Sequence, residues 1–176
     1  MAVSLKKSSK SETLTIRLDP KSRFMLEFLS RLKGQTITTV VERAIADAAN
    51  RETVLLDNPF SANPDEKTWR DFWSVSDAER NLKLARLPDV HPTFEEERRL
   101  DFAKRWWQFF FVNAHAMIVD RQLADILWPQ IDHFIEIEKD NQTTNVLAAG
   151  DAMAKALRGA GIEPPDWIPS NASIPF

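Results

Sequence analysis

The first clear pattern in the chain is an alternation of polar and apolar residues from Thr13 to Leu18. In a β-strand this alternation gives one polar face and one apolar face. The polar face consists of Thr13, Thr15 and Arg17, and the apolar face consists of Leu14, Ile16 and Leu18. No second strand of similar quality follows within hairpin distance, and one short strand cannot stand alone. We therefore predict that the segment pairs antiparallel with its own copy in a second chain, about a twofold axis.

Two amphipathic helices are predicted after this strand. Asp19 and Pro20 are suited to be the cap and first-turn residue of the first helix, and Gly34 to end it in the left-handed conformation. Thr36 or Thr38 can cap the second helix. The apolar residues that recur at helical spacing are Phe24, Phe28, Leu29 and Leu32 in the first helix, and Ile37, Val40, Val41, Ala44, Ile45 and Ala48 in the second.

From Asn63 onward the pattern predicts helices in almost every segment. A short helix is expected to begin at residues 63–66, where Asn-Pro-Asp-Glu resembles a helix start. Capping boxes at Ser76 with Glu79 and at Thr93 with Glu96 predict a helix to about Leu87 and a long helix that continues through Phe111.

Three further features complete the expected C-terminal region. A helix that starts near Asp120 should be broken or kinked at Pro129 before residues 131–139 continue it. The last helix should run from about Thr144 to Arg158 and stop at Gly159 and Gly161. The proline-rich residues 163–169 cannot be helical, so we expect an extended tail over the surface.

Aromatic residues are concentrated in this C-terminal region. They are Trp69, Phe72, Trp73, Phe94, Phe102, Trp106, Trp107, Phe109, Phe110, Phe111, Trp128, Phe134 and Trp167. Such a set can line a pocket for an aromatic or apolar effector, but aromatic residues at helical spacing usually fill a core. Residues 106–111 cover more than one helix face, which favours contact with a second helix layer or a second subunit.

The strand and the two helices, residues 13–50, resemble the ribbon-helix-helix family, which includes the Arc and methionine repressors and many bacterial antitoxins. The resemblance implies a mainly α fold: an obligate dimer with one intermolecular strand and two helices per chain, here followed by an all-helical domain. It implies a two-stranded ribbon in the major groove of double-stranded DNA, where Thr13, Thr15 and Arg17 contact the bases.

The resemblance also implies roles for residues of the helices. The start of the second helix, at Thr36, Ile37 and Thr38, is expected to hold a DNA phosphate. The expected dimer core consists of Leu14, Ile16, Leu18, Phe28, Val41 and Ile45.

Charge is distributed unevenly along the chain. Residues 1–34 contain eight basic and three acidic residues, a net +5, whereas the remainder contains 15 and 23, a net −8. A basic N-terminal face, doubled in a dimer, would attract phosphate although the whole protein is mildly acidic. Lys7 and Lys10 in the polar N-terminal arm are expected to contact the DNA backbone.

These observations predict five segments. Residues 1–11 form a flexible basic arm, 12–52 the DNA-binding and dimerisation domain, 53–64 a linker, 65–162 a helical aromatic-rich domain and 163–176 an extended tail.

The sequence contains little that suggests catalysis. It has no cysteine and no tyrosine, which excludes thiolate chemistry and attack on DNA through a tyrosine hydroxyl. His91, His115 and His133 have no metal-like spacing. Residues 95–99, Glu-Glu-Glu-Arg-Arg, place opposite charges at three- and four-residue offsets, which is typical of a solvated helix face. No phosphate loop is present, so we expect no enzyme, no metal and no cofactor. There is no long apolar run and no secretory signal, which predicts a cytoplasmic protein of bacterial type without a membrane partner.

Three functions are compatible with these features of the sequence. The first is a dimeric transcriptional repressor that recognises a palindromic operator, with a C-terminal domain that mediates higher oligomers or senses a ligand. The second is an antitoxin that regulates its own promoter and binds a toxin through the C-terminal domain. The third is an accessory DNA-binding protein of plasmid transfer or partition.

Overall fold

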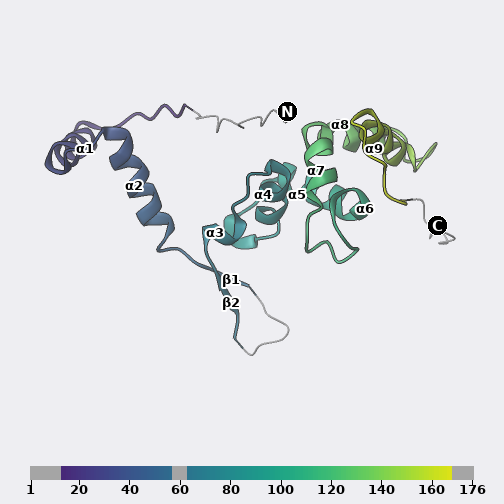
Figure 1. Cartoon of the computed structure of the whole chain (residues 1–176), viewed down its shortest axis with the longest axis horizontal. Coiled ribbons are helices and arrows are strands. Elements are labelled where there is room, and N and C mark those ends of the chain that lie inside the picture. The colour runs from purple at the N-terminus through teal and green to yellow at the C-terminus, as the bar shows by residue number, and fades with distance from the viewer. Residues whose placement is uncertain (1–12, 57–62, 168–176) are drawn as a thin grey trace, which may run out of the picture. The chain divides into compact units, whose positions relative to one another are not determined.

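The computed structural model describes residues 13–56 and 63–167 and divides the chain into two compact units, Met1–Glu52 and Thr53–Phe176. We refer to them as the N-terminal unit and the C-terminal unit. The described chain is mainly helical, with one small two-stranded sheet (Figure 1).

The N-terminal unit consists of an extended segment and two helices. Residues 13–19 precede α1 (Pro20–Lys33), and a short turn at Gly34 leads into α2 (Ile37–Ala49). The predicted first helix and its stop at Gly34 are confirmed, as is the cap of the second helix at Thr36. In the single chain, residues 13–19 carry no strand pairing among the described residues, so the intermolecular ribbon stays a prediction.

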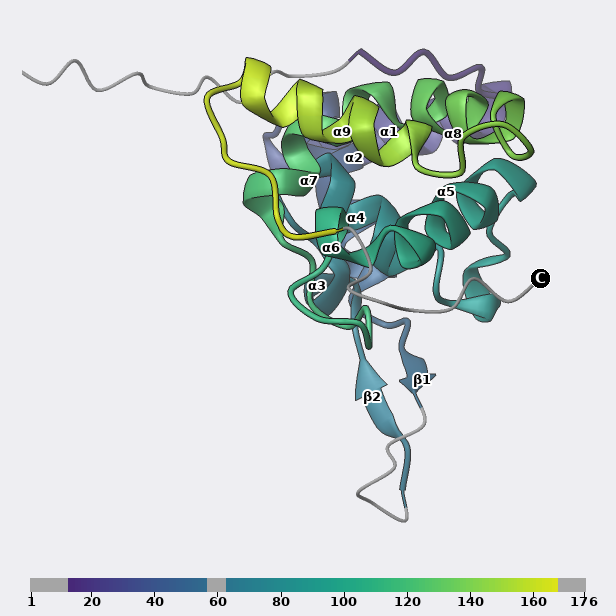
Figure 2. The ribbon, with the colours of Figure 1, turned by 90° about the vertical axis from the view of Figure 1, so that its right-hand side faces the viewer.

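The C-terminal unit opens with a β-hairpin that the sequence pattern did not predict. β1 (Val54–Leu56) pairs antiparallel with β2 (Asp65–Lys67), with Val54 opposite Lys67. Figure 2 shows the hairpin projecting from the helices of this unit. The expected helix start at residues 63–66 is therefore wrong, and so is an all-helical domain; β1 lies within the segment predicted as a linker. α3 (Trp69–Phe72) begins instead after Thr68, whose N–H donates to Asp71 at 2.8 Å.

The remaining elements of the unit are helices. They are α4 (Asp77–Leu84), the 3-10 helix η1 (Pro88–Val90), α5 (Phe94–Arg105), α6 (Trp107–Phe110), α7 (Arg121–Leu127), the 3-10 helix η2 (Trp128–Gln130), α8 (Ile131–Asp140) and α9 (Ala148–Gly159). Ser76 caps α4 and the Thr93–Glu96 capping box starts α5, as predicted. η2 marks the expected interruption at Pro129, whereas α9 begins later than the expected Thr144.

The predicted long helix through Phe111 is wrong. α5 ends at Arg105, and the backbone turns at Trp106 before α6 begins. Phe111 is extended and forms a bridge with Val119, and the Asp120 N–H donates to the Phe110 carbonyl at 2.9 Å. A straight helix would spread these aromatic residues over several faces. The turn at Trp106 lets the neighbouring rings reach one core instead.

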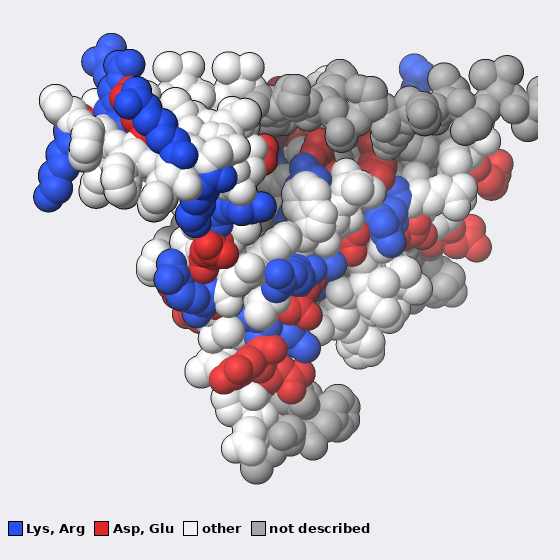
Figure 3. Space-filling model, turned by 60° about the vertical axis from the view of Figure 1, so that its left-hand side comes forward, with Lys and Arg blue, Asp and Glu red and all other residues white. Residues whose placement is uncertain are grey.

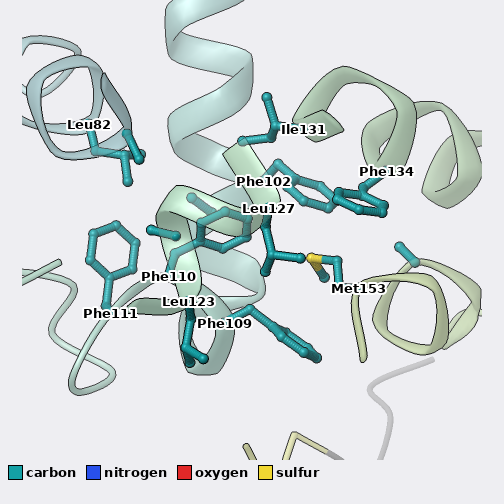
Figure 4. Packing of buried hydrophobic residues seen from close by; sticks show 14 of the residues in the cluster. Leu82, Phe102, Phe109, Phe110, Phe111, Leu123, Leu127, Ile131, Phe134 and Met153 are labelled. Atoms are coloured by element: carbon teal, nitrogen blue, oxygen red, sulfur yellow. The ribbon is translucent and has the colours of Figure 1, made fainter. Parts of the chain in front are cut away.

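The core of the C-terminal unit is formed by residues of α4 to α9 and buries six of the 13 aromatic residues, while Trp106, Trp107 and Trp128 pack against it partly buried. Phe102, Phe109, Phe110, Phe111 and Phe134 are almost fully buried. Figure 4 shows that Leu127 of α7 lies among the phenylalanine rings and next to Met153 of α9. The core interpretation is therefore correct for these residues. Trp73 and Phe94 remain exposed, and of the aromatic set only Phe72 borders a hollow of about 540 Å³ beside the β-hairpin.

The described part of the tail is non-helical, and residues 163–166 are exposed or half-buried, as predicted, but Trp167 is anchored in the core. Trp167 is buried and packs against Trp106 and Phe109, with ring centroids 5.8 and 5.7 Å apart. A β-carbon on Gly150 of α9 would lie 2.3 Å from the Trp167 ring and 2.7 Å from that of Trp106. The two indole rings can therefore pack against α9 at this position only because Gly150 has no side chain.

Ion pairs join α5 to α8 at the edge of the core. Arg99 donates two hydrogen bonds to Asp132, at 2.9 and 2.6 Å, and these hydrogen bonds hold the pKa of Asp132 below its ordinary value. Glu138 accepts hydrogen bonds from Arg105 at 2.6 Å and from the Trp106 indole at 2.8 Å. The charged residues 95–99 are thus not all on a solvated face, because Arg99 of α5 forms an ion pair with Asp132 of α8.

Candidate nucleic-acid interface

The extended segment of the N-terminal unit is open to solvent along its whole length. Thr13, Thr15 and Arg17 are exposed, as the predicted base contacts must be. Leu14, Ile16 and Leu18 are 77%, 57% and 49% exposed, although they are apolar. The chain does not bury these six residues against its own helices, so a strand formed by them has both faces available.

Both ends of α1 are capped, the start by the side chain of Asp19 and the end by Gly34. Asp19 accepts hydrogen bonds from the N–H groups of Lys21 and Ser22, at 2.9 and 3.0 Å, and the pKa of Asp19 is lowered chiefly by hydrogen bonds from Ser22. At the other end Gly34 has φ 58°, and Gln35 donates to the Ser30 carbonyl at 3.0 Å. This left-handed turn sets where the next helix begins.

The start of α2 presents free backbone donors at an exposed position. The Thr36 hydroxyl accepts a hydrogen bond from the Thr39 N–H at 3.2 Å. The N–H groups of Ile37 and Thr38 lie in the first turn, where a helix offers no acceptor of its own, and both residues are exposed. Such an end can bind an anion, because its N–H groups and the positive end of the helix dipole point outward.

The two helices leave most of their apolar residues uncovered. Within the described part of the N-terminal unit only Val40 is buried. Phe28 and Ile45 of the predicted dimer core are 54% and 59% exposed, and Val41 is partly buried. Phe24 stacks on Phe28 at 6.3 Å between ring centroids but is itself exposed.

An open groove of about 420 Å³ runs between α1 and α2. Val41, Ile45 and Leu29 line it together with Met25 and Leu26. Met25 and Leu26 were not expected here, because the predicted apolar stripe followed the Phe24–Phe28 side of α1. The four-residue spacing of Met25 and Leu29 was the signal for this second face.

Basic side chains project from the N-terminal unit on the face drawn in Figure 3, whereas blue and red side chains lie side by side over the C-terminal unit. α1 contributes Lys21, Arg23, Arg31 and Lys33, of which Arg23 pairs with Glu27 at 3.0 Å. Lys7 and Lys10 lie outside the described residues.

Among the described residues, no group of three or more His, Cys, Asp or Glu side chains is placed so that it could hold a metal ion. His91, His115 and His133 are exposed and lie on separate elements. Over residues 13–56 and 63–167, no helix is both long and apolar enough to cross a membrane.

Comparison of the chain with models of known protein families gave no match, and neither did comparison with curated proteins or with solved structures. Function is therefore inferred from the residues and their geometry.

Proposed function

We propose that the protein is a sequence-specific double-stranded DNA-binding homodimer that acts as a transcriptional repressor. Residues 13–18 of two chains pair antiparallel, and the polar face of this ribbon enters the major groove at a palindromic site. Thr13, Thr15 and Arg17 contact the bases, and the start of α2 in each chain binds a phosphate.

The observation that carries the proposal is the uncovered apolar surface of the N-terminal unit. Two helices that together bury one side chain cannot offset the conformational entropy lost on folding. A second copy supplies both missing elements, a partner for the strand and a cover for the apolar faces. Leu14, Ile16 and Leu18 are then buried under the ribbon, while Arg17 stays available on its other side.

Charge and helix geometry support DNA as the ligand. The apolar side of the strand carries no charge, and the opposite side carries two hydroxyls and one guanidinium, which match donor and acceptor groups of base edges. The exposed amides of Ile37 and Thr38 supply a phosphate contact that fixes the register. Basic residues of α1 add attraction to the DNA backbone that weakens with salt.

A repressor is proposed in preference to an antitoxin because the C-terminal unit has its own aromatic core. Antitoxins of the ribbon-helix-helix family usually bind toxins through a segment that is disordered in the free protein and folds on binding. Co-purification of a second protein with the full chain from its native source would favour the antitoxin alternative.

Selection of bound sequences from random double-stranded DNA tests the proposal directly. We expect a palindrome, and we expect Arg17→Ala to lose selectivity by about 1 to 3 kcal/mol per lost base contact without loss of the dimer. Arg158→Ala is the matched control, because it removes an exposed arginine at the end of α9. Recovery of no common sequence, or equal selectivity of Arg17→Ala and wild type, would refute the proposal, as would a monomer in sedimentation equilibrium.

A further inference from the structure

The C-terminal unit contains a hollow of about 540 Å³ between the β-hairpin, α3, α4 and the loop that follows α6. Its apolar walls are Leu56, Phe72, Leu87 and Met117. This volume lies within the range of small-molecule sites, roughly 300 to 1,000 Å³, and mostly apolar walls with a few polar groups are typical of them. All of its lining residues belong to the C-terminal unit, and none is among the proposed DNA-binding residues.

The charged residues that line the hollow are mainly cationic. They are Lys67, Lys83, Arg86 and Asp71, three positive charges and one negative. Residues 35–176 as a whole carry a net charge of −8, so this local excess of positive charge runs against the surrounding composition. The Asp71 carboxylate is engaged by Thr68, whose N–H lies 2.8 Å away, and hydrogen bonds from Thr68 lower its pKa.

The three cations differ in how far their charge is already compensated. Lys83 lies 2.9 Å from Glu79, and Lys67 lies 3.6 Å from Asp65. The guanidinium of Arg86 donates to the carbonyl oxygens of Met117 and Ala116, and among the described residues it forms no ion pair. It also lies over the Phe111 ring, 5.1 Å from the centroid.

Arg86 is therefore a partly buried cation without a carboxylate partner among the described residues. Burial lowers the pKa of Arg86, which is the sign of a charge that has lost solvent without gaining an anion. Arginine does not deprotonate in proteins, so the charge persists and an anion at this position gains a strong interaction. A smaller hollow that Arg86 also borders is lined by Glu97, Asp101 and Lys104, so its charges balance and it lacks the positive excess of the larger hollow.

We propose that this hollow binds a small molecule with an apolar body and one anionic group, in which the anion meets Arg86 and the body lies against Phe72, Leu87 and Met117. Lys67 and Lys83 at the same hollow strengthen the preference for a negative charge. An uncharged molecule of the same shape gains only the apolar contact, so charge decides which ligand is preferred.

Two dyes that differ by a single sulfonate test this proposal on the full chain. The anionic probe is 8-anilinonaphthalene-1-sulfonate, and the uncharged probe is N-phenyl-1-naphthylamine, which has the same rings. We expect the sulfonate probe to saturate at one molecule per chain in a fluorescence titration. In a two-dimensional amide NMR spectrum it should shift the signals of residues 67, 72, 83, 86 and 87.

Arg86→Gln should raise the dissociation constant of the sulfonate probe about tenfold or more and that of the uncharged probe less than about twofold. Lys155→Gln removes an exposed positive charge from α9 and should change neither constant. If circular dichroism shows that Arg86→Gln does not fold, Lys67→Gln on the hairpin replaces it, with a smaller loss in the same direction.

Three results would overturn the proposal. The first is an equal effect of the variant on both probes, which would mean that the positive charge does not select the ligand. The second is an unchanged affinity of the variant for the sulfonate probe. The third is a set of NMR shifts confined to residues 13–50, which would place the probe on the uncovered apolar surface of the N-terminal unit.

Discussion

Replacement of Gly150 by alanine tests whether the tail residue Trp167 is part of the core. In an open helix position this change stabilises a protein by about 1 kcal/mol, because alanine is the better helix former. At Gly150 the new methyl group would lie under 3.0 Å from two indole rings. Overpacking of this kind costs about 1 to 3 kcal/mol, and the rigidity of the rings favours the upper value. We therefore expect a net loss of about 2 kcal/mol.

Urea denaturation followed by tryptophan fluorescence measures this loss in the relevant unit, because all six tryptophans lie in residues 53–176. Gly159→Ala is the matched control. Gly159 also belongs to α9, but a β-carbon there meets no atom within 4 Å, so this variant should be neutral or slightly more stable. Only Gly150→Ala should thus lower the free energy of unfolding.

A stabilising effect of Gly150→Ala would refute the packing of Trp167 against α9. A double-variant test separates the two rings: in a Trp167→Ala background, the cost of Gly150→Ala should fall, because one of the two clashes is gone. An unchanged cost would assign the whole effect to Trp106.

Three further predictions concern other parts of the chain. Asp132→Asn should cost stability at neutral pH, by less than about 1 kcal/mol because the pair is half exposed; because the pKa of Asp132 is lowered in the folded protein, the difference from wild type in urea denaturation should shrink and vanish as the pH falls below about 4, and a difference that does not change with pH would contradict this. Ser76→Ala should lower the free energy of unfolding of the C-terminal unit by about 1 to 2 kcal/mol, because the cap of α4 and a hydrogen bond to Asp125 are lost; an unchanged urea midpoint would contradict this role. If the proposed dimer forms, Ile16→Glu should convert it to a monomer in sedimentation equilibrium while the tryptophan transition persists, and Val112→Glu, at another exposed apolar residue, should leave the association unchanged.

Features that depend on a few neighbouring residues could be predicted from the sequence. Asp19, Thr36, Ser76 and Thr93 cap helices because a short side chain reaches amides two or three residues ahead. Gly34 ends α1 for an equally local reason, its positive φ. Both the polar and the apolar residues of 13–18 are exposed in the single chain, so the predicted two faces of this segment stay a prediction.

Features that depend on distant residues could not be predicted in this way. α5 ends at Arg105, and a few residues later Phe111 forms a bridge with Val119. Hydrophobic periodicity alone contains no information about such a contact. β2 was mistaken for a helix start because Asn63 and Pro64 suit either, and the pairing with β1 decided the outcome. In the candidate interface, the proposed pairing of residues 13–18 involves a second chain, and the pattern within one chain contains no information on such a contact.

The burial of Trp167 bears on how the C-terminal unit is delimited for laboratory use. A fragment trimmed at Gly161, where the last helix has ended, would discard an indole that fills space beside α9 and leave a void above Gly150. Fragments made for crystallisation or for tagging should therefore retain the residues through 167. If a fragment without Trp167 aggregates, the cause would then be the cavity left in its core and not the choice of solvent.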